Sequence, residues 1–156
     1  MLNILGAGCA YPENIIDHEF LVSLGLTGSV EAVLDQTGIC RRYSVLRLPY
    51  IRETGNAGRS SAKAASTAGP TDLAISACRQ ALTRAGISPE QVGLVVGEAV
   101  TPDQLVPAEA QRVAGALGLK VAAYDICSAG GGLPFYLDTF SRWRPEALPE
   151  YTLCFS

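Results

Sequence analysis

Closely spaced metal-binding residues are the first thing this sequence lacks. It contains one histidine, His18, and its five cysteines form no C-x-x-C pair. Zinc sites need closely spaced Cys and His ligands, and disulfide frameworks need regular Cys spacings, so we expect neither a metal nor a disulfide network. Isolated cysteines are instead typical of small buried thiols in a reducing compartment. The five are Cys9, Cys40, Cys78, Cys127 and Cys154.

Long apolar runs and an excess of positive charge are missing as well. No run approaches the length of a transmembrane helix, so we expect no membrane partner. Lys and Arg number 12 against 15 Asp and Glu, and the net charge of −3 argues against a general nucleic-acid binder. The first residues, MLNILGAGCAYPENI, carry no basic leader, which predicts a cytoplasmic chain without a secretory signal.

The apolar content is sufficient for one domain with a substantial core. Hydrophobic residues make up 48% of the 156 residues, and charged residues 17%. Strand-like and helix-like segments alternate, which favours an α/β fold with a parallel-rich sheet and crossover helices. Asp17, Ser29 and Thr71 are predicted N-caps. Strands are predicted at 2–8, after Gly38, and at 92–100, 121–126 and 151–155, and helices at 17–25, 30–36, 71–86, before Gly118 and at 133–143.

One stretch, VAAYDICSAGGGLPFY at 121–136, has the pattern of a strand, a sharp turn and a helix start. A short apolar run ends there at Gly130, Gly131 and Gly132, and Pro134 follows in the first turn of the predicted helix. Such a turn directs unpaired backbone N–H groups and the positive end of the helix dipole toward one point. The three glycines are therefore predicted to form a backbone anion site.

A second glycine motif, Gly6-Ala7-Gly8, superficially suggests a dinucleotide-binding loop. The third small residue of that fingerprint is replaced by Tyr11, and Pro12 follows it, so no helix begins cleanly there. We therefore predict no nucleotide cofactor, and no cofactor of any other kind.

The stretch at 121–136 resembles the active-site turn of the ketoacyl-ACP synthase III branch of the thiolase superfamily, which reads roughly D-[VI]-x-x-A-C-x-G-F. Gly130 occupies the position of the nucleophilic Cys, so the resemblance implies that this chain has no catalytic residue there. Cys127 lies three residues too early to replace it and is predicted to be a buried structural thiol. The matching positions are Asp125, Ile126, Ala129 and Gly132, with Leu133 in place of the Phe.

Further matches extend the resemblance from Ile4 to Phe135. The opening ILGAGCAYPENIIDHEF is similar to the family's strand, G-x-G turn and [LY]-P-E segment, and TGICRR matches its T-G-I-x-x-R. The resemblance implies the first of two similar halves of a thiolase fold, with a five-stranded, mostly parallel sheet and helices on both faces. We expect one such N-terminal domain over 1–156. A third match consists of Thr101, Pro102, Asp103, Pro107 and Ala110.

Two departures concern coenzyme A. In the family, a Trp and an Arg help to hold the adenine, and Ala32 and Cys40 stand at these positions here. The usual stacking and charge contacts are therefore absent. The family's catalytic His and Asn come from the second half of the full-length enzyme, so His18 is predicted to be an inert surface residue.

A basic stretch interrupts the resemblance. Residues 47–70 are rich in Gly, Ser and Ala and are predicted to be an inserted loop or excursion. One interpretation is a solvated surface, and the other is a docking patch for an acidic carrier protein or phosphopantetheine. The candidate substrate- or carrier-binding residues are Arg41, Arg42, Arg47 and Arg52, with Arg59 and Lys63 nearby.

Three functions are consistent with these residues. The first is a ketoacyl-synthase-like N-terminal portion or non-nucleophilic subunit of a fatty-acid or polyketide-type condensing system, because an acyl-enzyme needs a nucleophile that Gly130 cannot supply. The second is an acyltransferase without a covalent intermediate, with the N–H groups of 130–132 as an oxyanion site. The third is a scaffold without chemistry. Acyl carrier protein or acyl-CoA is the implied ligand.

The chain is also expected to associate. The predicted helix at 133–143 carries more apolar residues than one sheet face can cover, and the predicted strand Tyr151–Phe155 leaves an open edge. We expect a homodimer, or a complex with a ketosynthase-like partner. The apolar residues of the helix are Leu133, Phe135, Tyr136, Leu137, Phe140 and Trp143.

Overall fold

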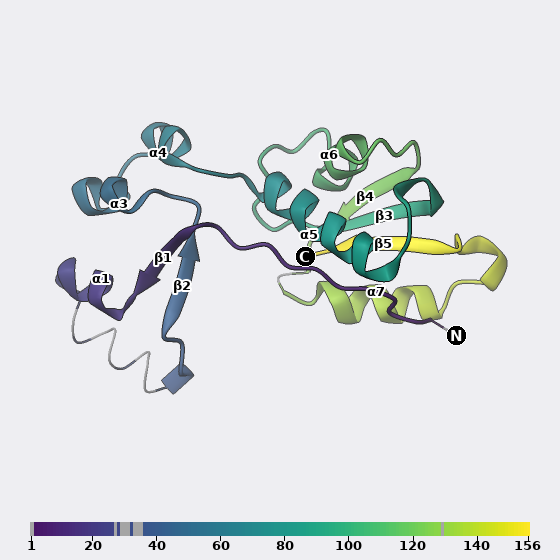
Figure 1. The fold of residues 1–156 in the computed structure, drawn as a ribbon, viewed down its shortest axis with the longest axis horizontal. Helices are drawn as coiled ribbons and strands as arrows, with labels where there is room; N and C mark the ends of the chain where they lie inside the picture. Colours follow the sequence, from purple (N-terminus) through teal and green to yellow (C-terminus); the bar gives the residue numbers. More distant parts are fainter. Residues whose placement is uncertain (1, 27, 29–31, 33–35, 129) are drawn as a thin grey trace. The chain divides into compact units, whose positions relative to one another are not determined.

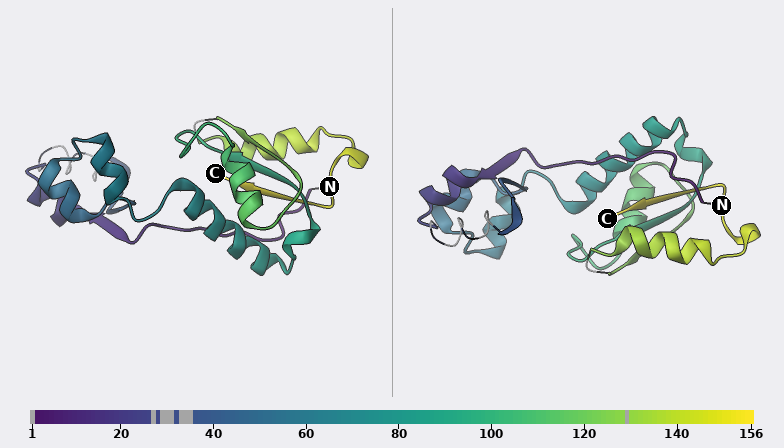
Figure 2. Two further views of the ribbon diagram at one scale, coloured as in Figure 1. Left: turned by 90° about the horizontal axis from the view of Figure 1, so that it is seen from above. Right: turned by 90° about the horizontal axis from the view of Figure 1, so that it is seen from below.

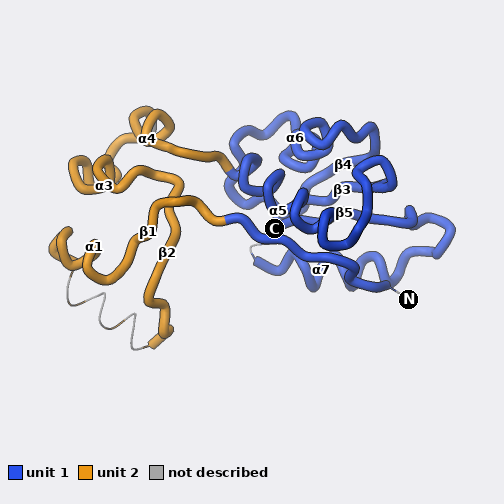
Figure 3. The backbone as a smooth tube through the Cα atoms, viewed as in Figure 1, with its two compact units in different colours: residues 1–10, 70–156 blue, residues 11–69 orange. Residues whose placement is uncertain are grey.

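A computed structural model describes residues 2–26, 28, 32, 36–128 and 130–156. The chain divides into two compact units (Figure 3): unit 1 comprises residues 1–10 and 70–156, and unit 2 comprises residues 11–69. Most of the predicted helix at 30–36, its Ser29 cap and the motif residue Ala129 fall outside the described residues. No helix in the described ranges is long and apolar enough to cross a bilayer.

Unit 1 is built on a three-stranded parallel sheet with the strand order β4-β3-β5 (Figure 1). Val95 in the central strand pairs with Ala123 on one side and Leu153 on the other. Two short 3-10 turns, Pro89–Gln91 and Pro145–Ala147, precede β3 and β5. The elements are α5 (Pro70–Ala85), β3 (Val92–Glu98), α6 (Glu109–Ala116), β4 (Ala122–Ile126), α7 (Gly132–Ser141) and β5 (Tyr151–Phe155).

Helices cover both faces of this sheet, as predicted. Alternate residues of β3 point to opposite faces, so Val95 packs with Cys78 of α5 and Val113 of α6, whereas Val96 packs with Tyr136 and Phe140 of α7. Figure 2 shows α5 and α7 on opposite sides of the strands. The sheet is therefore the middle of three layers.

The prediction of a five-stranded sheet was wrong. The described residues of 2–8 form no strand and instead pack against α5. A Cβ on Gly6 would lie 2.9 Å from the backbone nitrogen of Ala85, and one on Gly8 2.9 Å from that of Ala81. The Arg84 guanidinium donates a 2.7 Å hydrogen bond to the Ala7 carbonyl. Small residues thus allow this segment to contact a helix closely in place of pairing with a strand.

Unit 2 contains a separate two-stranded antiparallel sheet. β1 (Asn14–Asp17) pairs with β2 (Arg41–Ser44), with Asn14 opposite Ser44. The helix α1 (His18–Ser23) follows β1, and its predicted cap is confirmed because Asp17 Oδ1 accepts a 2.8 Å hydrogen bond from the Phe20 N–H. The strand predicted after Gly38 is thus confirmed as β2, but it belongs to a different sheet from β3, β4 and β5.

The predicted loop at 47–70 contains two short helices. α3 (Leu48–Thr54) has Pro49 in its first turn and ends at Gly55, and α4 (Arg59–Ala65) begins after Gly58. Proline near a helix start and glycine after its end are ordinary helix boundaries. The Ser- and Ala-rich composition is therefore compatible with helix, and of the two alternatives the segment is an excursion with helices, not a loop without secondary structure.

Candidate functional site

The Gly turn, described at residues 127, 128 and 130–132, follows β4 and leads into α7. Gly130 has φ of +95°, a conformation that L side chains rarely adopt, so the turn suits a glycine here. The strand, turn and helix start predicted from the sequence are confirmed, with α7 beginning at Gly132.

The carboxylate of Glu98 bonds to this turn. Glu98 is the last residue of β3 and pairs with Ile126 of β4, which places its side chain beside the turn. Its Oε1 accepts hydrogen bonds from Ser128 Oγ at 2.7 Å and the Gly130 N–H at 2.8 Å, and its Oε2 accepts one from the Gly132 N–H at 3.0 Å. The Gly131 N–H donates to the Ser128 carbonyl at 3.2 Å. All three predicted anion-binding N–H groups therefore have partners within the chain.

The anion that faces Gly130 and Gly132 is thus Glu98 itself. Hydrogen bonds from the Ser128 hydroxyl and then from the Gly130 N–H hold the pKa of Glu98 below its ordinary value, because they stabilise the ionised form. A Cβ on Gly132 would lie 3.0 Å from the carboxylate carbon of Glu98, so the close contact also requires glycine at this position.

Sequence reasoning missed Glu98. The sequence did carry a signal for it, because Glu98 is an acidic residue at the carboxyl end of a predicted buried strand. In a parallel sheet the carboxyl ends of neighbouring strands meet, which would bring this residue close to the Gly turn.

Asp125, a residue of the family motif, supports the start of α6. Its Oδ2 accepts a 2.7 Å hydrogen bond from the Glu109 N–H, and its Oδ1 accepts a 2.8 Å bond from the Ala110 N–H. The first N–H groups of a helix have no partner within that helix, and a carboxylate there also complements the helix dipole. Asp125 therefore connects β4 to α6.

An ionic network with a buried carboxylate at its centre lies at the start of the same helix. Glu109 is only 1% exposed, and its carboxylate accepts hydrogen bonds from the Asp103 N–H at 2.7 Å, from Arg112 at 3.2 Å and from the Thr71 hydroxyl. Asp103 Oδ2 lies 2.9 Å from Arg112 and 3.0 Å from Thr71. α5 begins at Pro70, so Thr71 is a buried member of this network and not the predicted N-cap.

The network favours structure over acid–base chemistry. Burial raises the pKa of Asp103, but the hydrogen bonds from Arg112 and Thr71 and the Arg112 charge outweigh it, so the pKa lies below the ordinary value. Both carboxylates bond to Arg112, the residue that faces them from α6. The buried charge of Glu109 is stabilised only while it remains paired.

The cysteines differ in burial. Burial raises the pKa of Cys78 to about 12 and that of Cys154 to about 11, which agrees with the prediction of structural thiols. Cys9, Cys40 and Cys127 are exposed, so the prediction of burial was wrong for them. β4 is an edge strand of the sheet, and Cys127 comes after its last residue. No described neighbouring strand therefore covers Cys127.

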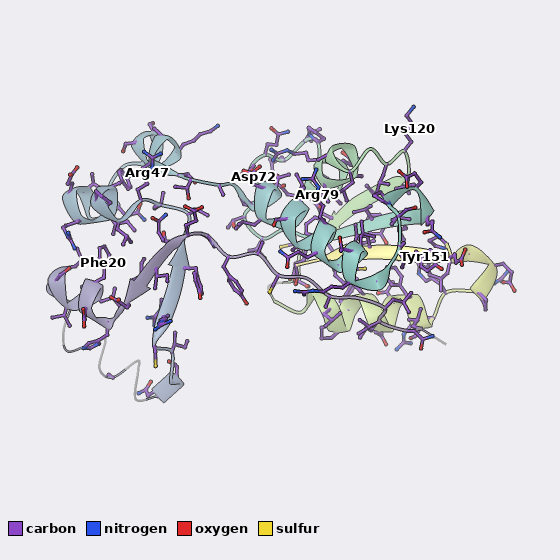
Figure 4. All side chains as sticks on the ribbon, in the orientation of Figure 1. Phe20, Arg47, Asp72, Arg79, Lys120 and Tyr151 are labelled. Atoms are coloured by element: carbon purple, nitrogen blue, oxygen red, sulfur yellow. The ribbon has the colours of Figure 1, made fainter. Side chains whose placement is uncertain are left out.

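The arginines predicted to bind substrate or carrier all belong to unit 2, whereas the Gly turn belongs to unit 1. Arg41 and Arg42 lie on β2, and Arg47 immediately precedes α3 (Figure 4). The Arg52 guanidinium lies 5.4 Å from the ring centroid of Phe20, a cation–π contact. In the described part of unit 2 none of these four forms an ion pair. Their binding role stays a prediction.

Two further expectations concern histidine and metal. His18 is half-buried, and its Nδ1 is buried without a hydrogen-bond partner among the described residues, so it is not the surface residue that was predicted. The described residues contain no group of His, Cys, Asp and Glu that could hold a metal ion.

Comparison with known proteins places these features in a family context. No protein-family model matches the sequence. The chain is 33% identical over 135 residues to beta-ketoacyl-[acyl-carrier-protein] synthase III of Clostridium perfringens, which covers 86% of this chain and 35% of that protein. The enzyme of the same name from Rhodospirillum centenum is 33% identical to this chain, and the match covers 36% of that enzyme. The chain thus spans little more than a third of the length of these relatives.

Solved structures give the same result. The 3-oxoacyl-[acyl-carrier-protein] synthase III of Aquifex aeolicus matches with a TM-score of 0.69 and 27% identity over 88% of this chain and 38% of that one. AbyA1, a tetronic acid condensing enzyme, matches with a TM-score of 0.67 and 28% identity over 90% and 40% of the two chains. OleA of Xanthomonas campestris, at 22% identity and a TM-score of 0.72 over 97% and 42% of the two chains, supports the fold alone. The chain is therefore a homologue of the thiolase-like ketoacyl-ACP synthase III condensing enzymes, corresponding to about 35–40% of their length at the N-terminal end.

Proposed function

We propose that this chain is a non-nucleophilic portion or subunit of a fatty-acid or polyketide-type acyl-condensing system, and that it acts with a ketosynthase-like partner. The observation that carries the proposal is Gly130, which stands where the family motif has its Cys. A glycine has no side chain to accept an acyl group, so the acyl-enzyme and the two-step transfer of the family are unavailable at this position.

The contacts of Glu98 favour this supporting role over acyl transfer without a covalent intermediate. An oxyanion site needs free donors aimed at the oxygen on which negative charge develops. The N–H groups of Gly130 and Gly132 already donate to the Glu98 carboxylate, and that ionised group repels a second anion. Transfer without a covalent intermediate would therefore first require the displacement of Glu98.

The exposed face of α7 supports a partner. Tyr136 and Phe140 of this helix are buried against the sheet, whereas Leu133, Phe135 and Leu137 are 53%, 49% and 38% exposed. In addition, β4 and β5 each have one neighbouring strand among the described residues. Apolar helix faces and open strand edges are features of association surfaces. A homodimer, or a complex with the chain that supplies the family's His and Asn, would cover them.

The basic residues of unit 2 suggest the ligand. Arg41 and Arg47 are exposed, and acyl carrier proteins and phosphopantetheine are anionic. Cys40, at the position of the family's adenine-binding Arg, carries no positive charge, which favours a carrier protein over coenzyme A. Replacing Arg41 and Arg47 by Glu is expected to weaken carrier binding and to flatten its salt dependence. The same change at Lys120, in the other unit, is the control, and equal effects of both would contradict a docking role.

The proposed function is tested by incubating the purified chain with acetyl-CoA or acyl-ACP and malonyl-ACP, with a complete ketoacyl-ACP synthase III in parallel. We expect no mass increase on the chain and no condensation product, because the nucleophile is missing. Acylation or turnover by the chain alone would refute the proposal. Carrier binding without a mass change would favour the supporting role, and no binding to any carrier would favour the scaffold.

A further inference from the structure

Glu98 joins three structural elements through one carboxylate. It belongs to β3, its donors Ser128 and Gly130 follow β4, and its third donor, Gly132, is the first residue of α7. Both carboxylate oxygens are used. Hydrogen bonds to an ionised acceptor are roughly twice as strong as neutral ones, so this one side chain fixes the turn to the sheet.

We propose that Glu98 is a positioning residue that holds the Gly turn in one fixed conformation. Its carboxylate occupies the N–H donors that would otherwise be available to a ligand oxygen. The turn is then a fixed structural connection while Glu98 is ionised. Glu98 has this role in the turn whether or not the chain acts with a partner.

The chemistry of the turn explains why a carboxylate is needed. The N–H groups at the start of α7 have no acceptor within the helix, and the helix dipole favours a negative charge at this end. No described cation lies within ion-pair distance of Glu98, so its stabilisation comes from the hydroxyl and the N–H groups. A neutral Gln would place an NH₂ group against N–H donors and could satisfy only part of them.

The other described titratable groups at this end of the sheet are Cys127 in the turn, Asp125 and Tyr124 on β4, Tyr136 on α7 and Cys154 on β5. Burial, together with the charges of Cys154 and Glu98, raises the pKa of Tyr136, whose hydroxyl donates to the Phe155 carbonyl at 2.9 Å. Burial also raises the pKa of Tyr124 and Cys154, so both remain neutral in the range where Glu98 titrates. Asp125 is the remaining carboxylate, and it bonds to Glu109 and Ala110.

The test is amide hydrogen exchange followed by NMR on the whole chain, in the wild type, Glu98→Gln and Glu146→Gln. Glu146 is an exposed glutamate in the 3-10 turn Pro145–Ala147, so its replacement removes the same charge away from the turn. In Glu98→Gln we expect the Gly130 and Gly132 amides to exchange at least about tenfold faster. The Gly131 amide, which donates to the Ser128 carbonyl, should change less, and Glu146→Gln should leave all three unchanged.

A pH titration of the wild type provides a second measurement that does not depend on the folding of a variant. The Gly130 and Gly132 amide shifts should follow the titration of the Glu98 side-chain carbon with one common midpoint, and Gly131 should respond less. A folded Glu98→Gln chain with unchanged protection would overturn the proposal. It would also be overturned if these two amides did not titrate with Glu98, even where the variant failed to fold.

Discussion

The carboxylate of Asp125 on β4 accepts a 2.8 Å hydrogen bond from the backbone N–H of Ala110 in the first turn of α6. Asp125→Asn removes the charge and one of two good acceptors while keeping the size of the side chain. We expect the free energy of unfolding to fall by about 1–2 kcal/mol, measured by urea denaturation. Asp138→Asn, which breaks an exposed pair with Arg142, is the control and should have no measurable effect. Equal effects of the two substitutions would contradict the capping role.

Asp103 predicts a dependence of stability on pH. Its folded pKa lies below the ordinary value, so its contribution is fully present above the unfolded pKa of about 3.9 and is lost as the pH falls through the lower, folded pKa. Wild-type stability should therefore decrease with acidification in this range, and Asp103→Asn should show a shallower slope. Urea midpoints measured at several pH values test this, with Glu146→Gln as the control. An unchanged slope in Asp103→Asn would assign the acid sensitivity to other groups.

Gly132→Ala tests the contact between the turn and Glu98. The added Cβ would lie 3.0 Å from the Glu98 carboxylate carbon, so we expect a destabilisation of about 1–3 kcal/mol. Combined with Glu98→Ala, the cost should be smaller than the sum of the single effects, because the obstructing group is absent. Gly115→Ala in α6, where a Cβ meets nothing within 4 Å, is the control. Strict additivity of the two changes would show that the contact is not formed.

The exposed face of α7 predicts association. We expect sedimentation at low micromolar concentration to detect a dimer or larger species, or a complex if the partner is present. Replacing Leu133 and Phe135 by Glu should shift the chain toward monomer, because each charge would have to be buried in the interface. Leu26→Glu, at another exposed leucine, should not. A well-folded, monodisperse wild-type monomer would contradict this surface assignment.

Local sequence patterns were sufficient to predict secondary structure where a segment determines its own conformation. Tyr151–Phe155 is a strand within the predicted bounds, and Asp17 caps α1, because apolar runs and capping residues act over a few positions. The same apolar pattern at 2–8 did not distinguish pairing in a sheet from packing on a helix. That choice depends on Gly6 and Gly8 meeting α5, more than 60 residues later in the sequence.

The candidate site was predicted in part for the same reason. The Gly turn is local, and its sequence sufficed to locate it and its N–H donors. Glu98 is 32 residues from Gly130, and their hydrogen bond exists only because β3 and β4 are neighbours in the sheet. A sequence motif locates donors, whereas the acceptor that reaches them is determined by strand order.

The left-handed backbone of Gly130 limits which residues can replace it. A Cβ there has space, but φ of +95° costs an L-residue on the order of 1 kcal/mol or more. The N–H of this residue also donates to the Glu98 carboxylate, so a thiol here would belong to a residue whose backbone is already bonded to a negative charge. A cysteine at position 130 would therefore require a different backbone conformation in the turn as well as a different residue.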